Sequence, residues 1–384
     1  MGRKRLGVVL GINQTLSWGM TFYLPAVIVV PASRELGQTS FALLGAFTMS
    51  LLLAGLCAPR VGRWIDRNGG KGSLAGSIVV LALGQAVLAL SPNLAVWYVG
   101  WAVLGIGMAM GLYDAAFATV GTLLGRDSAP IITGITLFAG FASTVFWTLG
   151  ASVIGFAGWR GLMWLYACLM LAVNLPMVLA LVPRLDRNRK EPAQAVDERA
   201  PVARMAIICL AGFFTVRWFI TSALAANILT LLHGMGLTAA EAVAVASLIG
   251  PGQVAGRIVE WTIGRRFHLL IRARLAALLF PIGAAVLPLG GPFAATGFAL
   301  LYGMSNGIMT INRGTLPLAL FGPNGYATVL GWLAVPVLVA QAVAPTMAAP
   351  VVAALPALWV FLIAGGMGLF ATLLLLPLRL PNQD

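Results

Sequence analysis

Charged residues are scarce in this chain of 384 residues. Asp, Glu, Lys and Arg together make up 9% of it, whereas hydrophobic residues make up 60%. Because a soluble globular domain carries about 25% charged residues, so small a share cannot cover a surface that faces water. The shortage excludes an ordinary soluble fold and indicates that most of the chain faces lipid or other membrane helices.

Residues that bind metals or act as nucleophiles are few as well. The chain has 3 cysteines, all inside apolar segments and without regular spacing, and 2 histidines at segment ends. This is not the spacing of a metal site or of a disulfide framework. No nucleophile–base arrangement and no phosphate-binding loop is visible in the sequence. We therefore expect no enzyme, no cofactor and no metal.

What the chain does have is a series of apolar segments, each long enough to cross a bilayer, which takes about 20 residues. They are continuous rather than alternating in twos, which indicates helices and not a β-barrel. We predict an all-α integral membrane protein with twelve transmembrane helices. The predicted helices are residues 6–31, 39–62, 72–91, 94–123, 130–156, 160–182, 205–232, 239–262, 270–290, 294–321, 325–350 and 355–378.

The excess of basic residues, a net charge of +13, lies mainly on one side of the predicted membrane segments. With a cytoplasmic N-terminus, the outside segments hold only Arg34 and Arg160, and the other Lys and Arg of the connecting segments lie inside. The positive-inside rule then places both termini in the cytoplasm, and we expect a bacterial inner membrane. The basic residues indicate contact with anionic membrane lipid. No basic and aromatic surface for nucleic acid is present.

The longest polar stretch, residues 183–204, divides the predicted helices six and six. We expect an N-terminal six-helix bundle over 1–182, a cytoplasmic linker over 183–204 and a C-terminal six-helix bundle over 205–384. Parallel six-helix repeats are typical of transporters that bind substrate between their halves.

Short sequences recur in the same order in the two predicted bundles. "GRWID" at 62–66 matches "GRIVE" at 256–260 as Gly-Arg-x-x-acid, and "GMAMG" at 107–111 matches "GMSNG" at 303–307. The matches are short, but their common order supports two related halves.

Charged residues gather between the second and third predicted helices, in "GRWIDRNGGKGS" at 62–73. The pattern Gly62-x-x-x-Asp66-Arg67-x-Gly69-x-Lys71 resembles the loop signature of the major facilitator superfamily. With the twelve helices and the central linker, this resemblance covers essentially the whole chain. It implies a fold of two six-helix bundles, a monomer, and a loop that holds the outward-facing state.

The charge cluster is therefore interpreted as a conformational latch. Asp66 can pair with Arg63 or Arg67, or it can accept hydrogen bonds from amides at the N-terminus of a neighbouring helix. The predicted latch residues are Gly62, Arg63, Asp66, Arg67, Gly69 and Lys71, with Arg257 and Glu260 as their counterpart in the second half.

Two departures from the superfamily's patterns bear on the substrate. Trp101 precedes Gly105-Ile106-Gly107 where many proton-coupled members have an arginine, and residues 134–155 lack the Gly-Pro signature of drug/proton antiporters. The stretch "YLPAVIVVPASRELGQTSFALLGAF", paired with a glycine-rich fourth helix, is more similar to the monocarboxylate-porter and oxalate/formate branch.

Ionisable residues inside membrane helices are costly to bury and are candidates for function. Three stand out: Asp114, Arg217 and Arg313. The resemblance implies that the first, fourth, seventh and tenth helices line a central cavity, which would hold all three. The candidate substrate-binding residues are Asn13, Gln14, Trp18, Tyr23, Tyr113, Asp114, Arg217, Asn227, Asn306, Asn312 and Arg313.

Arg217 cannot lose its charge and needs a partner in the membrane. A substrate carboxylate bound by two parallel hydrogen bonds is one candidate partner; helix carbonyls or Asp114 are the others. Asp114 and Arg313 are interpreted as an inner gate, and Asp114 also as a proton carrier; a static structural pair is the alternative.

Two arginines against one carboxylate favour a small organic anion. We predict a secondary active transporter of a monocarboxylate-like substrate, working by rocker-switch alternating access, with proton symport or facilitated exchange as the mode. The alternative is efflux of a drug or toxic compound.

Overall fold

The computed structural model describes residues 2–185 and 201–380. These residues form helices joined by short turns, and no strand occurs among them. The prediction of an all-α membrane protein is confirmed. By length and composition, seven helical stretches of the described residues are long and apolar enough to cross a membrane, and one of these, Leu94–Leu181, runs through three of the predicted segments.

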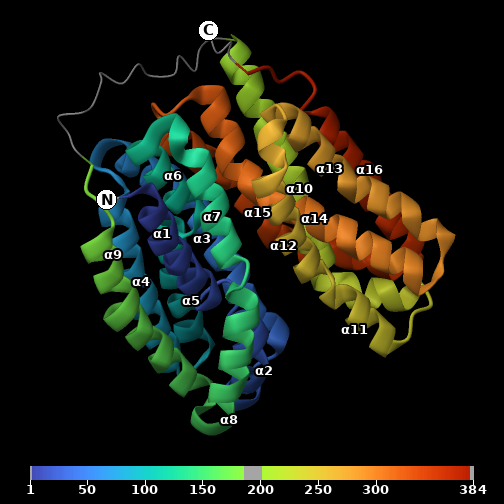
Figure 1. Ribbon diagram of the computed structural model, residues 1–384. Coiled ribbons are helices and arrows are strands. Elements are labelled where there is room, and N and C mark those ends of the chain that lie inside the picture. The colour runs from blue at the N-terminus through green and yellow to red at the C-terminus, as the bar shows by residue number, and fades with distance from the viewer. Residues whose placement is uncertain (1, 186–200, 381–384) are drawn as a thin grey trace. The chain divides into compact units, whose positions relative to one another are not determined.

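The chain divides into two compact units (Figure 1). The first contains the described residues of Met1–Ala195 together with Gly322–Leu338, and the second contains those of Val196–Phe321 together with Val339–Asp384. The domain limits predicted from the sequence, with a linker over 183–204, stay a prediction.

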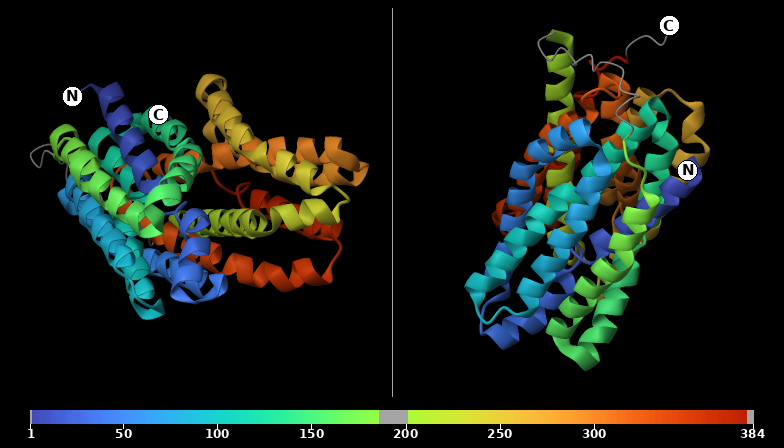
Figure 2. Two further views of the ribbon diagram at one scale, coloured as in Figure 1. Left: turned by 90° about the horizontal axis from the view of Figure 1, so that it is seen from below. Right: turned by 90° about the vertical axis from the view of Figure 1, so that its left-hand side faces the viewer.

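The first unit holds the first six predicted segments, several of them interrupted. Its helices are α1 (Arg3–Gly19), α2 (Pro25–Leu36), α3 (Ser40–Asn68), α4 (Gly70–Ala89), α5 (Leu94–Gly111), α6 (Tyr113–Leu124), α7 (Ala129–Ala139), α8 (Ala142–Leu169), a π-helical turn (Met170–Asn174) and α9 (Leu175–Leu181). Helices α4 and α9 lie side by side in Figure 1 and in Figure 2. The first part of α15 (Tyr326–Ala354) also belongs to this unit.

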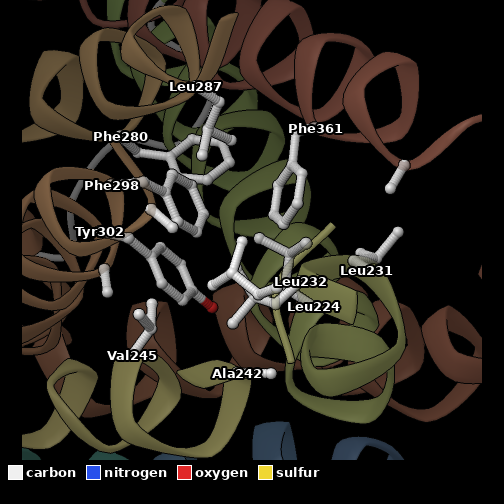
Figure 3. Close-up of a cluster of buried hydrophobic side chains, with 14 of the residues drawn as sticks. Leu224, Leu231, Leu232, Ala242, Val245, Phe280, Leu287, Phe298, Tyr302 and Phe361 are labelled. Carbon is white, nitrogen blue, oxygen red and sulfur yellow. The ribbon is translucent and has the colours of Figure 1, made fainter. Parts of the chain in front are cut away.

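The second unit holds the remaining helices. They are α10 (Pro201–Gly234), α11 (Ala239–Ser247), α12 (Ile249–Thr262), α13 (Leu269–Val286), α14 (Gly291–Phe321), the second part of α15, and α16 (Ala357–Leu373). A cluster of buried apolar side chains lies between α10, α11, α13, α14 and α16 (Figure 3).

Glycines allow some of these helices to pack at backbone distance. In the second unit, a Cβ on Gly256 of α12 would lie 2.5 Å from the Met304 carbonyl oxygen of α14, and one on Gly307 would clash with the Gln253 carbonyl of α12. Such close approach, rather than apolar area, stabilises helix pairs in a bilayer.

The recurring glycine motifs do not pack alike in the two units. Gly107 and Gly111 of "GMAMG" face Leu81 and Ser77 of α4. Gly307, at the matching place of "GMSNG", faces α12 instead. The sequence match therefore does not mark equivalent packing positions.

An ion pair joins α2 to α8 in the first unit. The Arg160 Nε donates to Glu35 Oε1 at 2.7 Å, and Trp159 Nε1 donates to Glu35 Oε2 at 2.5 Å. Arg160 also donates to the carbonyls of Ala89 and Ser91 at the end of α4. The hydrogen bond from Arg160 lowers the pKa of Glu35; partial burial acts in the opposite direction, and Trp159 adds to the lowering.

Candidate functional site

The polar residues of α1 form a closed hydrogen-bond network inside the first unit. Asn13 Nδ2 donates to Asn174 Oδ1 at 3.0 Å, and Gln14 Nε2 donates both to Asn13 Oδ1 at 3.0 Å and to the Gly111 carbonyl at 2.7 Å. Gln14 Oε1 accepts from Trp18 Nε1 at 3.2 Å. These bonds use all four side-chain polar groups of Asn13 and Gln14, and all the partners belong to the first unit. Both side chains are buried.

Asn174 is a member of this network that the sequence analysis missed. It lies at the end of the π-helical turn Met170–Asn174 and is fully buried. Such turns are rare and are frequent at functional sites. An asparagine inside the apolar segment 160–182 was the available signal.

Aromatic rings extend the network. The Trp18 ring lies 4.7 Å from the Tyr113 ring and 6.2 Å from that of Tyr23, and Tyr113 stacks on Phe117 at 5.1 Å. Trp147 Nε1 donates to the Tyr23 carbonyl. The structure therefore brings together three of the predicted substrate-binding residues, Trp18, Tyr23 and Tyr113.

Asp114 follows Tyr113 in the first turn of α6 and is half-buried. Its predicted gate partner, Arg313, belongs to the other unit, so the gate pair stays a prediction.

Arg217 of α10 has no exposed surface and is the most deeply buried charge among the described residues of the second unit. Its Nη2 donates to Ser305 Oγ at 3.1 Å and to Asn306 Oδ1 at 3.0 Å, both on α14. Its Nε and Nη1 have no hydrogen-bond partner among the described residues. The only groups hydrogen-bonded to the guanidinium in the described part of the chain are thus neutral.

The guanidinium also lies over an aromatic surface. Its Cζ is 4.9 Å from the ring centre of Phe280, a distance at which a cation is attracted to a π-system. Phe280 belongs to the aromatic part of the buried cluster, where the Tyr302 ring stacks on Phe298 at 5.6 Å and Phe298 contacts Phe361 at 4.9 Å (Figure 3). The cluster therefore packs against one face of the Arg217 guanidinium through Phe280.

The geometry of a guanidinium decides what could bind there. Its two hydrogen-bonding edges, Nε with Nη2 and Nη1 with Nη2, share Nη2. Since Ser305 and Asn306 both accept from Nη2, a carboxylate that binds one edge in parallel must replace one of them. Neither residue would then be stranded: Ser305 Oγ also donates to the Ala276 carbonyl, and Asn306 Oδ1 also accepts from Thr221 Oγ1.

The remaining candidates of the second unit lie in varied surroundings. Arg313 is half-buried, with its Cζ 5.2 Å from the Trp218 ring centre. Asn227 donates to the Ala223 carbonyl of its own helix. Asn312 is fully buried, and neither of its side-chain polar atoms has a hydrogen-bond partner among the described residues.

At the predicted latch, Asp66 accepts hydrogen bonds from the first turn of α15. Its Oδ1 accepts from the Ala327 N–H at 3.2 Å, and its Oδ2 accepts from the Thr328 N–H at 2.8 Å and from Thr328 Oγ1 at 2.6 Å. A carboxylate at a helix N-terminus is favoured by the helix dipole. The contact with a helix N-terminus foreseen for Asp66 is thus present.

Two glycines make this contact possible. A Cβ on Gly62 would clash with the Ala327 carbonyl oxygen, so only glycine allows α15 to approach. Gly69 ends α3 with a φ of 79°, a conformation that favours glycine. Arg63 and Arg67 are exposed, and Lys71 is half-buried.

The predicted counterpart in the second unit is built differently. Glu260 pairs with Arg272 of α13, at 2.7 Å, rather than with a helix N-terminus. Arg257, one turn before Glu260, is buried, and its Nε and Nη1 have no hydrogen-bond partner among the described residues. The recurrence of Gly-Arg-x-x-acid thus does not predict the same contact.

The sequence profile of the Major Facilitator Superfamily matches residues 10–345, and the chain belongs to that superfamily. This confirms the resemblance noted in the loop at 62–73 and agrees with the all-helical fold of the described residues.

Two solved structures with a similar fold are distant from this chain in sequence. The human organic anion transporter MFSD10 (TETRAN) has a TM-score of 0.78 at 19% identity, covering 98% of this chain and 100% of that one. FucP, a Major Facilitator Superfamily transporter solved in the outward conformation, has a TM-score of 0.73 at 14% identity, covering 96% and 97%. At such identities the likeness is one of fold.

Proposed function

We propose that this chain is a secondary active transporter of a small organic anion and that Arg217 binds the anionic group. The observation that carries the proposal is a fully buried guanidinium of which, among the residues that the structure describes, two nitrogens have no hydrogen-bond partner and the third donates only to neutral acceptors. A buried, unpaired charge costs several kcal/mol. A substrate carboxylate would supply the missing negative charge and two strong hydrogen bonds.

The aromatic base under Arg217 suits a small organic anion better than an inorganic one. Phe280 offers apolar contact beside the guanidinium, and a carboxylate with a short carbon chain can use both. The similarity in fold to an organic anion transporter supports the same class of substrate. A monocarboxylate-like compound is the simplest member of that class.

The finer assignments are part of the same proposal. The two halves, 1–182 and 205–384, would rock about a central site as a monomer in the bacterial inner membrane, with both termini in the cytoplasm. Asp66 would latch one state, Asp114 and Arg313 would close the inner gate, and Asp114 would carry a proton in symport. The remaining candidate residues would line the substrate path.

Efflux of a drug or toxic compound is the second candidate. The aromatic group of Trp18, Tyr23 and Tyr113 in the first unit supports it, because flat hydrophobic cations bind well to such rings. The two candidates differ in the charge of the ligand.

A thermal-shift screen of the purified protein separates the two. The carboxylate set is formate, acetate, lactate, pyruvate and oxalate, and hydrophobic quaternary ammonium ions form the contrast set. A ligand at one hundred times its Kd stabilises by about 2.7 kcal/mol. We expect stabilisation by a carboxylate that is lost in Arg217→Met. Stabilisation by cations alone, unchanged in that variant, would establish the efflux alternative.

A further inference from the structure

The fourth membrane segment is broken at one residue. Helix α5 ends at Gly111 and α6 begins at Tyr113, and Leu112 between them is extended, with φ −78° and ψ −167°. No proline lies at the break. In a continuous helix the carbonyls of Met110 and Gly111 would accept from the N–H groups four residues on. The extended Leu112 removes them from that ladder.

Two side chains from two other helices take up these carbonyls. Ser73 Oγ of α4 donates to the Met110 carbonyl at 2.8 Å, and Gln14 Nε2 of α1 donates to the Gly111 carbonyl at 2.7 Å. Both side chains are buried, at 3% and 0% exposed. Because a buried carbonyl without a hydrogen-bond partner is costly, the break is stable only if side chains donate hydrogen bonds to these carbonyls.

We infer that Ser73 and Gln14 are positioning residues that hold the break at Leu112 and thereby fix the first turn of α6. That turn carries Tyr113 and Asp114, to which the proposed function gives roles in the substrate path and the gate. This positioning role requires no contact with the substrate, although Gln14 is also one of the residues proposed to line the substrate path. The inference rests on the proposed function only for the roles of Tyr113 and Asp114; the structural part stands alone.

Gln14 is suited to positioning Tyr113 because it binds both the residue before the break, Gly111, and the ring that Tyr113 packs against, Trp18. While its Nε2 holds Gly111, its Oε1 accepts from Trp18 Nε1, and the Trp18 ring lies against Tyr113. Residues after a break follow the direction that the extended residue sets, since each further helical residue turns by about 100°. If Leu112 became helical, Tyr113 would turn away from Trp18.

The chain contains a matched control for Ser73. Ser77 lies one turn further along α4, is equally buried, and donates to the Gly107 carbonyl of α5 at 2.7 Å. Gly107 is inside the unbroken helix, where the Gly111 N–H is its regular partner. Ser77 also lies against Gly111, but removing its hydroxyl deletes a similar bond and leaves the donors to the Met110 and Gly111 carbonyls in place.

The test is hydrogen–deuterium exchange of the full chain in lipid nanodiscs. We expect peptides covering residues 112–116 to exchange about tenfold faster in Ser73→Ala and Gln14→Leu than in the unchanged chain. Ser77→Ala should leave these peptides unchanged, and Ser73→Thr, which keeps the hydroxyl, should restore slow exchange. Equal acceleration in Ser73→Ala and Ser77→Ala, or none in Ser73→Ala, would overturn the inference. If Gln14→Leu does not fold, the three serine variants decide.

A second readout links the break to transport. In proteoliposomes, the KM for the carboxylate found in the screen should rise about tenfold or more in Ser73→Ala, a loss of about 1.4 kcal/mol by the usual conversion, and stay unchanged in Ser77→Ala. If the unchanged chain transports no carboxylate, the proposed function fails while the exchange experiment still decides the inference. An unchanged KM together with faster exchange in Ser73→Ala would show that Ser73 stabilises the break but does not position residues for transport.

Discussion

Helices α1 and α10 carry the polar residues of the two units in opposite ways. On α1, Asn13 and Gln14 form hydrogen bonds with Asn174, Gly111, Trp18 and each other. On α10, Arg217 keeps two of its three nitrogens without a hydrogen-bond partner among the described residues. A network whose hydrogen bonds are all made stabilises one geometry. A buried charge without an opposite charge beside it instead favours the binding of a ligand that supplies one. Under the proposed function, the first unit would contribute the shape of the site and the second unit the charge that selects the substrate.

The largest effect should come from removing that charge. Arg217→Met deletes the guanidinium but keeps most of its length, and we expect carboxylate affinity to fall about 100-fold or more, because a hydrogen bond to a charged group contributes about 1.5–3 kcal/mol. Arg217→Lys keeps the charge without the fork and should recover only part of the affinity. Titration calorimetry of the detergent-purified variants measures both. Full carboxylate affinity in Arg217→Met would contradict the proposal that Arg217 binds the anionic group.

The comparison of α1 with α10 also predicts that Gln14→Leu lowers the stability of the ligand-free protein, whereas Arg217→Met does not. Gln14→Leu leaves the Gly111 carbonyl and Asn13 Oδ1 without their donor, at a cost of about 1–3 kcal/mol for each buried group. Arg217→Met strands neither Ser305 nor Asn306, which keep other partners, so stability without ligand should stay equal or rise. Thermal denaturation in detergent without substrate tests both. A drop for Arg217→Met as large as that for Gln14→Leu would mean that Arg217 is structural.

A smaller effect should separate Asp66 from Glu260. Asp66→Asn retains one acceptor oxygen for three donors on α15 and loses the attraction to the helix dipole, worth about 0.3–1 kcal/mol. The expected result is faster labelling of Thr328→Cys in a background without the three native cysteines; this reporter lacks the Thr328 hydroxyl but keeps the two backbone N–H donors to Asp66. Glu260→Gln, which touches Arg272 and not α15, serves as the control. Equal labelling rates in the two variants would contradict the assignment of the latch to Asp66.

The smallest effect should be the loss, at acid pH, of the stability that the ion pair between Glu35 and Arg160 contributes. Because the pKa of Glu35 is lowered in the folded protein, its contribution is present above the ordinary glutamate pKa and is lost as pH falls through the lowered value. The pair is partly exposed, so it contributes at most about 1 kcal/mol. Denaturation temperatures from pH 6 downward should fall less steeply in Glu35→Gln than in the unchanged chain. Identical slopes would show that the pair contributes nothing.

The sequence predicts the membrane fold because hydrophobicity and length decide which segments cross a bilayer. Apolar composition also predicts Arg217 as a functional candidate, since a charge inside such a segment has to be explained. The partner of Asp66 could only be foreseen as a type of contact, because the first turn of α15 lies about 260 residues further along the chain.

Local sequence says little about the break at Leu112. The surrounding "GMAMGLYDAAF" contains no proline, and the donors that make the break possible come from α1 and α4. The same holds for Gln14, which the sequence marks as polar and inside the membrane but whose bonds only the fold determines. Matching short motifs likewise fails where packing differs, as between "GRWID" and "GRIVE".

The most direct test of the central claim is counterflow in proteoliposomes loaded with one unlabelled carboxylate from the screening panel. Labelled carboxylate should accumulate transiently in vesicles that contain the unchanged chain, and Arg217→Met should abolish this accumulation while Ser77→Ala preserves it. Counterflow that persists in Arg217→Met, or that occurs only with hydrophobic cations, would contradict the claim that the buried guanidinium of α10 selects the substrate.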